Sequence, residues 1–553
     1  MNLRSSFAPM PGVLRSRLRF TACLGVGVGV VLGTSAAAAP LTVQEVVDRV
    51  REAGGWDAAN PAGKLVALAG RGSLIGVEQD VEMLVSPKGD YYAAYRGDLP
   101  IAEGVITAPP TLWTRDLGNE ILTPSLGDAD TLRLRALALT GAWTAPGALE
   151  LRLDPLTSDD QAVLNFKLPD GLIAGVIRID RKAWRVTQWS YSAGDGDRGI
   201  RFEGAIESGL GWFPSRVIST GTSGEETTIE LASAALASDA QAAMLQKPAL
   251  RNGHPDDVSF DASVPAELEV KRARSGHLLV RPKVNGREAA WWIFDTGAGQ
   301  NCVDKKVVES LGLRRFGVVP VNGIGGTIRS NFVRPATLSL GPVTLADPIM
   351  TELDLSMIGT ALGEEIGGIV GFNTIFRCVA RVDLALARVS LHDPVGFDAA
   401  GINWTPVRLY GRHPIVDARF EGRHGLFKLD TGANNTVSFH VPAVENLKLL
   451  DGRDTTESKT GGVGGMRTVR RGKVSSFELG GKILENVDAE FATEKVGALH
   501  DAYSLGNIGV KLMRGFELVF DYQNGRMGFV DRPLPEKKDP PKTDNQKPDA
   551  DGK

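Results

Sequence analysis

The chain has 553 residues, of which 42% are hydrophobic and 23% are charged, and its formal net charge is −4. This length suits about three compact units, and the hydrophobic share excludes a wholly disordered polymer. Only 3 cysteines are present, which is too few for a disulfide framework. Since basic residues are not in excess, nucleic acid is not an expected partner.

Residues 1–39 have the pattern of a secretory signal peptide. Several arginines precede an apolar stretch that runs from Phe20 to about Ala36, and Ala37-Ala38-Ala39 before Pro40 is typical of a cleavage site. The alternative is an uncleaved membrane anchor, because the stretch approaches the length that spans a bilayer. Such a signal on a chain with few cysteines favours the bacterial periplasm, or secretion more broadly.

Residues 40–235 are predicted to form a β-rich domain. A helix is expected near residues 43–53, followed by short alternating segments, such as 175–179 and 227–231, that turn residues separate. This pattern resembles the half-barrel of periplasmic lipoprotein-carrier domains, which implies an α+β half-barrel but identifies no ligand residues. The alternative is a generic β-domain that assists folding. Residues 236–267 are predicted to be a linker.

The sequence Asp-Thr-Gly-Ala occurs twice, at residues 295–298 and 430–433, each time after a mainly apolar run. A single copy is consistent with an ordinary turn, in which Asp accepts backbone N–H groups and Gly supplies a positive φ. Two copies with the same flanks are much harder to explain as turns. Two matched carboxylates at strand ends can instead face each other across a pseudo-dyad.

The repetition extends well beyond these motifs. A hairpin turn, a leucine-rich stretch, a glycine-rich segment and an apolar-apolar-glycine element recur in the same order. In the first copy they lie at residues 284–286, 307–313, 323–326 and 369–371. In the second copy they lie at residues 420–422, 441–447, 461–465 and 507–509. Corresponding points are about 134 to 139 residues apart, which indicates one duplicated unit.

Together these elements resemble the retropepsin-like aspartic peptidases, in the bacterial form that fuses two lobes in one polypeptide. The resemblance covers roughly residues 268–532, with lobe 1 at 268–398 and lobe 2 at 399–531. It implies a mainly β fold with a pseudo-twofold axis and one catalytic aspartate per lobe, Asp295 and Asp430. Two departures stand out: neither glycine-rich segment carries a tyrosine, and Asn507 interrupts the apolar pair of the second copy.

The chemistry expected of such a pair follows from electrostatics. Two carboxylates about 3 Å apart cannot both ionise readily, so they share one proton, as the aspartic protease dyad does, over a range of about pH 2 to 5. The ionised member would take a proton from a bound water, which attacks a peptide carbonyl while the protonated member stabilises the oxyanion. The expected substrate is an extended polypeptide, with no cofactor and no metal.

The other site candidates surround the two aspartates. Thr296 and Thr431 are predicted to hydrogen-bond across the lobe junction, and Gly297 and Gly432 to permit close backbone approach. The glycine-rich segments are flap candidates that would close over the substrate. Their glycines are Gly323, Gly325, Gly326, Gly462, Gly464 and Gly465.

Two cysteines, Cys302 and Cys378, lie in lobe 1 and form either a disulfide or two buried thiols. The tail at residues 532–553 is rich in Pro, Lys and Asp and is expected to be disordered. The chain is predicted to be a monomer that forms an intramolecular pseudo-dimer.

The main functional hypothesis is an aspartic endopeptidase. The alternative is a catalytically silent scaffold that binds peptides in the lobes or a lipophile in the N-terminal domain. The retention of Asp and Thr in both copies favours the enzyme, because a binding protein has no need of paired carboxylates.

Overall fold

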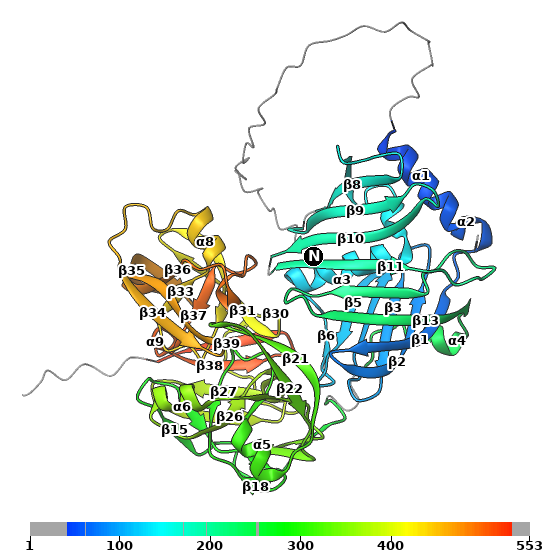
Figure 1. The fold of residues 1–553 in the computed structure, drawn as a ribbon. Coiled ribbons are helices and arrows are strands. Elements are labelled where there is room, and N and C mark those ends of the chain that lie inside the picture. Colours follow the sequence, from blue (N-terminus) through cyan, green and yellow to red (C-terminus); the bar gives the residue numbers. More distant parts are fainter. Residues whose placement is uncertain (1–40, 61, 170, 195, 250–253, 533–553) are drawn as a thin grey trace, which may run out of the picture. The chain divides into compact units, whose positions relative to one another are not determined.

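The computed structural model describes residues 41–532 except 61, 170, 195 and 250–253 (Figure 1). The predicted signal peptide at residues 1–39 therefore lies outside the described residues, as does the tail beyond Arg532. The described part is mainly β, as predicted, with a large antiparallel sheet followed by two β lobes. Within it, no helix is long and apolar enough to cross a membrane.

The N-terminal domain begins with α1 (Val43–Gly54), as expected, and α2 (Trp56–Ala59). The Thr42 side chain accepts a hydrogen bond from Glu45 N at the start of α1, and Gly55 ends the helix with a φ of 67°. A 13-stranded sheet follows, in the order β6-β5-β4-β3-β2-β1-β13-β12-β11-β10-β9-β8-β7. Its strands are β1 (Val66–Leu74), β2 (Val77–Val85), β3 (Tyr91–Arg96), β4 (Ala102–Thr107), β5 (Pro110–Arg115), β6 (Ile121–Leu122), β7 (Glu150–Leu153), β8 (Gln161–Lys167), β9 (Ala174–Asp180), β10 (Arg185–Ala193), β11 (Gly196–Glu203), β12 (Arg216–Thr220) and β13 (Glu226–Leu236).

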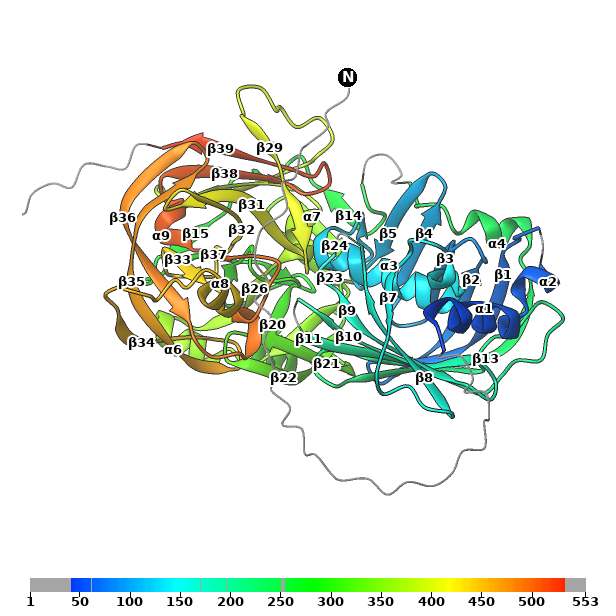
Figure 2. The ribbon, with the colours of Figure 1, turned by 90° about the horizontal axis from the view of Figure 1, so that it is seen from above.

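The sheet curves around α3 (Leu126–Thr140), which contacts β3, β4 and β10 and leads into a 3-10 helix, η1 (Ala142–Thr144) (Figure 2). The sequence does not predict α3, because the apolar residues of this helix alternate with a period of two, which is typical of a strand. In a helix this spacing places apolar side chains on every side. Leu132, Leu134, Ala136 and Ala138 are accordingly all buried, as expected for a helix enclosed by a curved sheet.

The predicted linker at residues 236–267 is partly structured. It contains α4 (Asp239–Ala243), which begins with a capping box of Ser238 and Gln241, and β14 (Val258–Phe260). β14 pairs with β24 (Val343–Ala346) of lobe 1. This segment therefore belongs in part to lobe 1, since its Val258 and Phe260 pack against the core of the lobes.

Each lobe contains one eight-stranded sheet, and lobe 1 also contains a five-stranded sheet. The other elements of lobe 1 are β15 (Val270–Arg272), β16 (Leu278–Val280), β17 (Lys283–Val284), β18 (Arg287–Glu288), β19 (Trp291–Phe294), β20 (Cys302–Asp304), α5 (Lys305–Leu311), β21 (Arg315–Gly323), β22 (Gly326–Val333), β23 (Thr337–Leu340), β25 (Met350–Leu353), α6 (Ser356–Leu362), β26 (Ile366–Val370), α7 (Phe372–Phe376), β27 (Val379–Asp383) and β28 (Arg388–His392). Lobe 2 contains β29 (Trp404–Pro406), β30 (Arg408–Tyr410), β31 (His413–Phe420), β32 (Arg423–Leu429), β33 (Val437–Phe439), α8 (Val441–Asn446), β34 (Thr456–Gly462), β35 (Gly465–Leu479), β36 (Lys482–Ala492), the 3-10 helix η2 (Gly497–Leu499), β37 (Gly506–Ile508), α9 (Val510–Met513), β38 (Phe516–Asp521) and β39 (Arg526–Asp531).

The two lobes repeat the same strand pairings. In lobe 1, β26 is parallel to β19 and antiparallel to β20, and β20 is parallel to β25. In lobe 2, β37 is parallel to β32 and antiparallel to β33, and β33 is parallel to β36. The predicted hairpin turns also recur, since Asn285 and Glu421 both have positive φ and each precedes a glycine with positive φ. The duplication seen in the sequence is therefore also present in the fold.

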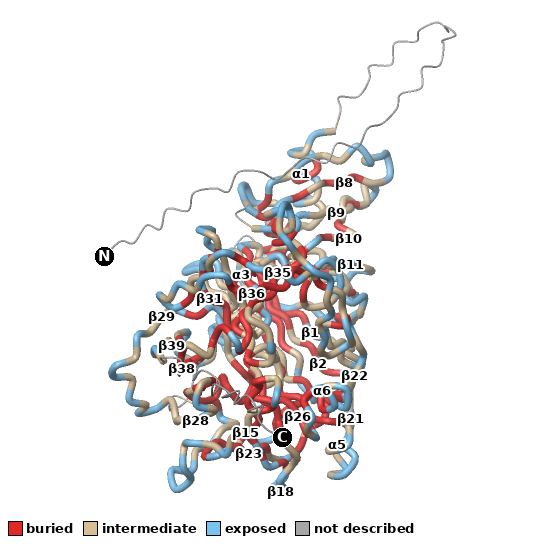
Figure 3. The backbone as a smooth tube through the Cα atoms, turned by 90° about the vertical axis from the view of Figure 1, so that its left-hand side faces the viewer, coloured by how far each residue is buried: buried red, intermediate tan, exposed pale blue. Residues whose placement is uncertain are grey.

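The lobes share one sheet and one core. The closing strands β27 and β38 pair antiparallel at the centre of a five-stranded sheet, β28-β27-β38-β39-β29. One cluster of buried side chains includes Phe294 and Phe372 of lobe 1 with Phe427 and Phe520 of lobe 2. The buried backbone accordingly runs through strands of both lobes (Figure 3). Because the core is continuous, the ends of β19 and β32 are held in fixed positions relative to each other.

A buried ion pair ties the N-terminal domain to lobe 1. The Arg377 guanidinium, next to the end of α7, contacts the Glu120 carboxylate, and their side chains are 2% and 0% exposed. Arg377 also pairs with Asp257 at 2.5 Å, and Asn373 Nδ2 donates to Glu120 Oε1 at 2.9 Å. Since α7 directly follows β26, the N-terminal domain braces an element that holds the first Asp-Thr-Gly loop.

Replacing Arg377 by methionine tests this brace. Arg377→Met leaves Glu120 buried without its cation, and removing one partner of a buried pair typically costs about 3–5 kcal/mol of unfolding free energy. Arg388→Met is the matched control, because its pair with Glu267 is 64% and 63% exposed. Urea unfolding should show a large loss for Arg377→Met and almost none for Arg388→Met. Equal losses would contradict a special role for the buried pair.

Candidate active site

Each Asp-Thr-Gly loop begins where a central strand ends. Asp295 follows β19 and its backbone N–H donates to Val370 O at 2.9 Å, while Asp430 follows β32 and donates to Ile508 O at 3.0 Å. The acceptors belong to β26 and β37, the predicted apolar-apolar-glycine elements. The parallel pairing of these strands therefore places both aspartates at equivalent points of the two lobes.

Thr296 and Thr431 join the loops reciprocally. Thr296 N donates to Thr431 Oγ1 at 2.9 Å, and Thr431 N donates to Thr296 Oγ1 at 3.1 Å. Each hydroxyl then donates across the junction, from Thr296 to Leu429 O at 2.7 Å and from Thr431 to Phe294 O at 2.8 Å. Both threonines are buried. The hydrogen bonds predicted across the lobe junction are thus present in the structure.

The two carboxyl groups meet between the loops. Gly297 N donates to Asp295 Oδ1 at 2.7 Å, and Gly432 N donates to Asp430 Oδ1 at 3.0 Å. A Cβ atom on Gly432 would lie 2.3 Å from Asp295 Oδ2, and one on Gly297 would lie 2.3 Å from Asp430 Oδ1. Each carboxyl group therefore packs on the glycine of the opposite lobe, where no side chain fits.

Burial and mutual repulsion raise the pKa values of the pair. Burial, with the facing charge of Asp430, raises the pKa of Asp295 well above its usual range. Burial also raises the pKa of Asp430, although the Gly432 N–H, His277 and the Asn507 amide oppose this rise. Asp295 therefore holds a proton up to higher pH than an ordinary aspartate does.

A histidine from each lobe contacts the Asp-Thr-Gly loop of the other lobe. His277 Nε2 donates to Gly432 O at 2.8 Å, and its Nδ1 accepts from Ser275 Oγ at 2.6 Å. His413 interacts with the backbone of Gly297. Burial, followed by the Lys428 cation, lowers the pKa of His413 to about 3, so its ring is neutral near pH 7.

Neither histidine is among the site residues predicted from the sequence. The available signal was the repeat itself, since each lies at a similar distance before its Asp-Thr-Gly motif, after a turn that contains Gly276 or Gly411.

A buried polar network lies behind Asp430. Asn507 Nδ2 donates to Asp430 Oδ2 at 3.0 Å, and His440 Nε2 lies 2.9 Å from Asn507 Oδ1. Ser504 Oγ lies 3.2 Å from His440 Nδ1 and 2.7 Å from Asp501 Oδ2. Lys428 Nζ pairs with the same carboxylate at 2.9 Å. The residue that weakened the sequence match, Asn507, is thus in direct contact with one aspartate.

The flap candidates form two hairpins, β21–β22 and β34–β35, whose tips meet. Gly325 N donates to Val463 O at 2.9 Å, and a Cβ on Gly325 would lie 2.0 Å from the Gly464 carbonyl carbon. Arg467 also donates to Gly325 O.

The six candidate glycines divide by their surroundings. At Gly323, Gly325, Gly326 and Gly464 a Cβ would contact the other hairpin, and at Gly462 it would lie 3.3 Å from Ile324. A Cβ on Gly465 would have no other atom within 4 Å, and the requirement there is its φ of 116°. Val321, Ile328 and Val463 of the hairpins pack on one apolar cluster with Ala298, which follows the first Asp-Thr-Gly.

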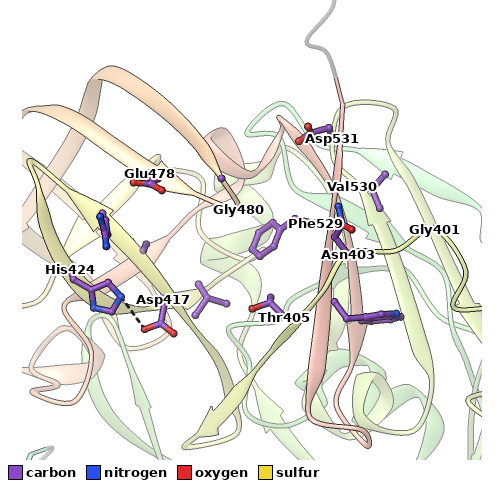
Figure 4. Close-up of a pocket in the computed structure, with 15 residues that line it drawn as sticks. Gly401, Asn403, Thr405, Asp417, His424, Glu478, Gly480, Phe529, Val530 and Asp531 are labelled. Carbon is purple, nitrogen blue, oxygen red and sulfur yellow. Dashed lines mark ion pairs between the residues drawn. The ribbon is translucent and has the colours of Figure 1, made fainter. Parts of the chain in front are cut away.

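Two cavities lie away from the aspartates. The larger, of 570 Å³, is lined by strands β29, β31 and β39 and by the β35–β36 turn, with Asp417, His424, Glu478 and Phe529 in its wall (Figure 4). The smaller, of 210 Å³, lies in the N-terminal domain between α1, the end of α3 and β10. Neither is lined by an Asp-Thr-Gly loop.

The two lobe-1 cysteines are buried free thiols, which decides between the alternatives left open by the sequence. Their sulfur atoms donate to backbone oxygens, from Cys302 to Gln300 O at 3.5 Å and from Cys378 to Thr374 O at 3.4 Å. Among the residues described by the structure, no group of three or more His, Cys, Asp or Glu side chains could hold a metal ion.

Comparison with known families decides what the duplicated unit is. Residues 280–374 and 416–510 each match the aspartyl protease family. The chain contains two aspartyl protease domains. Each matched segment carries one Asp-Thr-Gly motif and its apolar-apolar-glycine element, which is consistent with an intramolecular pseudo-dimer. The N-terminal sheet lies outside both matched segments, and a search among curated proteins found no match.

The threonine contacts can be tested by substitution at one position. Thr296→Val keeps the shape but leaves Thr431 N and Leu429 O without partners, at about 1–3 kcal/mol for each buried group. Thr296→Ser keeps the hydroxyl and should unfold near the wild-type urea concentration. If the two variants unfold at the same concentration, the hydroxyl does not hold the lobes in register.

Proposed function

We propose that this protein is an aspartic endopeptidase in which Asp295 and Asp430 activate a water between them. The observation that carries the proposal is the meeting of the two carboxyl groups, one from each lobe, on glycines that admit no side chain. A scaffold that only binds peptides has no need to hold two half-buried carboxylates in contact, because their mutual repulsion costs free energy.

The reaction requires one ionised and one protonated carboxyl group. The ionised group takes a proton from water as the oxygen attacks the peptide carbonyl carbon, and the protonated group donates to the carbonyl oxygen. In the second step the base returns its proton to the amide nitrogen as the C–N bond breaks, and the other carboxylate recovers a proton from the tetrahedral intermediate. The dyad ends in its starting state, without an acyl-enzyme.

An extended polypeptide is the substrate that the surrounding elements favour. The β21–β22 and β34–β35 hairpins offer backbone groups that can pair with a strand-like chain, as in β-strand addition. Both carboxylates come from one chain, so a monomer supplies the whole site.

Export to the bacterial periplasm is a further part of the proposal. It rests only on the signal-like sequence of residues 1–39, which lie outside the described structure.

A second candidate function concerns the N-terminal domain. Its 210 Å³ cavity is lined largely by apolar and aromatic side chains, including Val186, Phe202, Trp184 and Trp212. Such a lining favours a small apolar ligand. This candidate is compatible with peptidase activity in the lobes, and binding of a small hydrocarbon probe, followed by tryptophan fluorescence, would test it.

Conversion of either aspartate to asparagine tests the proposed peptidase. Asp295→Asn and Asp430→Asn are nearly isosteric but each removes the acid or the base. Either change should therefore lower kcat/KM on a fluorogenic peptide library by a factor of at least about 10² to 10⁴. The double variant should be scarcely worse than the worse single variant, because the second carboxylate has no role alone.

Asp488→Asn, at an exposed carboxylate whose side chain is 78% accessible, is the control. Wild-type activity should fall at low pH as the base becomes protonated, and at high pH as the raised pKa of Asp295 is passed. Near-normal cleavage by either single active-site variant would contradict the proposal. Peptide binding without cleavage by wild type would favour the silent scaffold.

A further inference from the structure

The two lobes differ at one pair of equivalent positions beside the aspartates. In lobe 1, Ile369 of β26 pairs with Ile293 and Cys302. In lobe 2, the equivalent residue of β37 is Asn507, which pairs with Lys428 and Ser438. The backbone register is the same, so the difference lies only in the side chains.

The lobe-1 position is apolar throughout. Ile293, Cys302 and Ile369 belong to a buried cluster that includes Leu279 and Leu353. Behind Asp295 the equivalent side chains are therefore two isoleucines and a thiol that donates to Gln300 O. The Asp295 carboxyl group accepts from the backbone N–H of Gly297.

The lobe-2 network reaches Asp430 through the Asn507 amide, whose Nδ2 donates to Asp430 Oδ2 at 3.0 Å. If His440 Nε2 carries a proton, it donates to Asn507 Oδ1, and the Asn507 amide group then points its N–H at Asp430 Oδ2. His440 Nδ1 lies 3.2 Å from both the backbone oxygen and the hydroxyl oxygen of Ser504, and that hydroxyl donates to Asp501 Oδ2 at 2.7 Å. An amide donor favours the charged form of the carboxylate it faces.

We propose that Asn507, oriented by His440, makes Asp430 the ionised carboxylate of the dyad and leaves the shared proton on Asp295. This inference rests on the proposed peptidase function and deepens it. Asp430 then takes the proton of the attacking water and later passes it to the amide nitrogen, while Asp295 donates to the carbonyl oxygen and recovers a proton when the C–N bond breaks. Asn507 and His440 are positioning residues, since neither touches the reacting atoms.

The other ionisable groups near the two aspartates either favour an ionised Asp430 or are themselves uncharged near neutral pH. His277 faces Asp430 from lobe 1, and burial lowers its pKa, so its ring is uncharged near pH 7 and becomes an attractive cation only in acid. Asp295 is faced by Asp430, with Cys302 and Tyr522 nearby, and burial raises the pKa values of both neighbours, which leaves them uncharged.

His440 itself is set between opposite charges. Burial and then the Lys428 cation lower its pKa to about 4, whereas Asp501 opposes the shift. Near neutral pH the ring is therefore neutral with one proton to donate. If the ring gains a second proton in acid, Nε2 still donates to Asn507, so the orientation of the amide persists over the working range.

The test is the pH profile of kcat/KM for the full chain on a fluorogenic peptide. In Asn507→Ser the hydroxyl is too short to replace the amide donor, so the pKa of Asp430 should rise and the acidic limb should move upward by about one pH unit. His440→Gln keeps a side-chain N–H donor and should retain most of the wild-type profile. Ile369→Val, at the equivalent position of lobe 1, should leave both limbs in place.

The outcomes separate this inference from the proposed function. If wild type cleaves peptides and Asn507→Ser leaves the acidic limb unchanged, or moves the alkaline limb instead, the assignment of the base to Asp430 is overturned. If wild type neither cleaves peptides nor binds a statine-containing peptide, the proposed function fails and this inference fails with it. Should Asn507→Ser not fold, the isosteric Asn507→Asp replaces it, and its added carboxylate should move the acidic limb still further upward.

Discussion

The reciprocal contact of Thr296 and Thr431 is the interaction on which the rest of the site depends. Each hydroxyl accepts from the backbone of the opposite loop and donates to the strand that precedes it, so four hydrogen bonds form across the junction within a buried environment. Buried backbone groups must be paired, and these pairs exist only when both loops are in one register. The register in turn brings Asp295 and Asp430 together, on glycines that leave room for nothing larger.

The backbones around the two aspartates are equivalent, but the side chains around them differ. The strand pairings of the lobes are equivalent, yet apolar side chains lie behind Asp295, whereas an amide, an imidazole, a carboxylate and an ammonium group lie behind Asp430. The symmetric backbone brings the two carboxyl groups together. Side-chain asymmetry supplies a reason for them to differ in protonation, which acid–base catalysis requires. A duplicated chain can specialise its halves in this way, whereas two identical subunits start with equal environments.

Much of this arrangement could be predicted from the sequence because it repeats. The chain contains two Asp-Thr-Gly-Ala motifs, two hairpin turns and two glycine-rich segments in the same order. Such a repetition is improbable by chance. α3 was not predicted because its alternating Leu and Ala residues imitate a strand, and only enclosure by the curved sheet makes such a helix favourable. β14 was assigned to a linker because a short strand gives little periodic signal.

The asymmetric residues were harder to interpret. In the sequence, Asn507 weakens the match between the two copies. Its contact with Asp430 depends on the three-dimensional distance between them and on His440, which lies far away in sequence. His277 and His413 act across the lobe junction, and pairwise spacing within one motif does not reveal contacts between lobes. An alignment of the two halves would show Asn507 as a difference between them, and His277 and His413 as a shared feature.

The central claim is that Asp295 and Asp430 share one proton as a coupled pair. The most direct measurement is a ¹³C NMR titration of the wild-type protein labelled at the aspartate carboxyl carbons, with Asp295→Asn and Asp430→Asn used to assign the two signals. Coupling predicts that both signals respond in two separate steps, the upper one well above pH 4, and that either substitution collapses the remaining signal to a single step. Two independent single steps near pH 4, unchanged by substitution of the partner, would contradict the account.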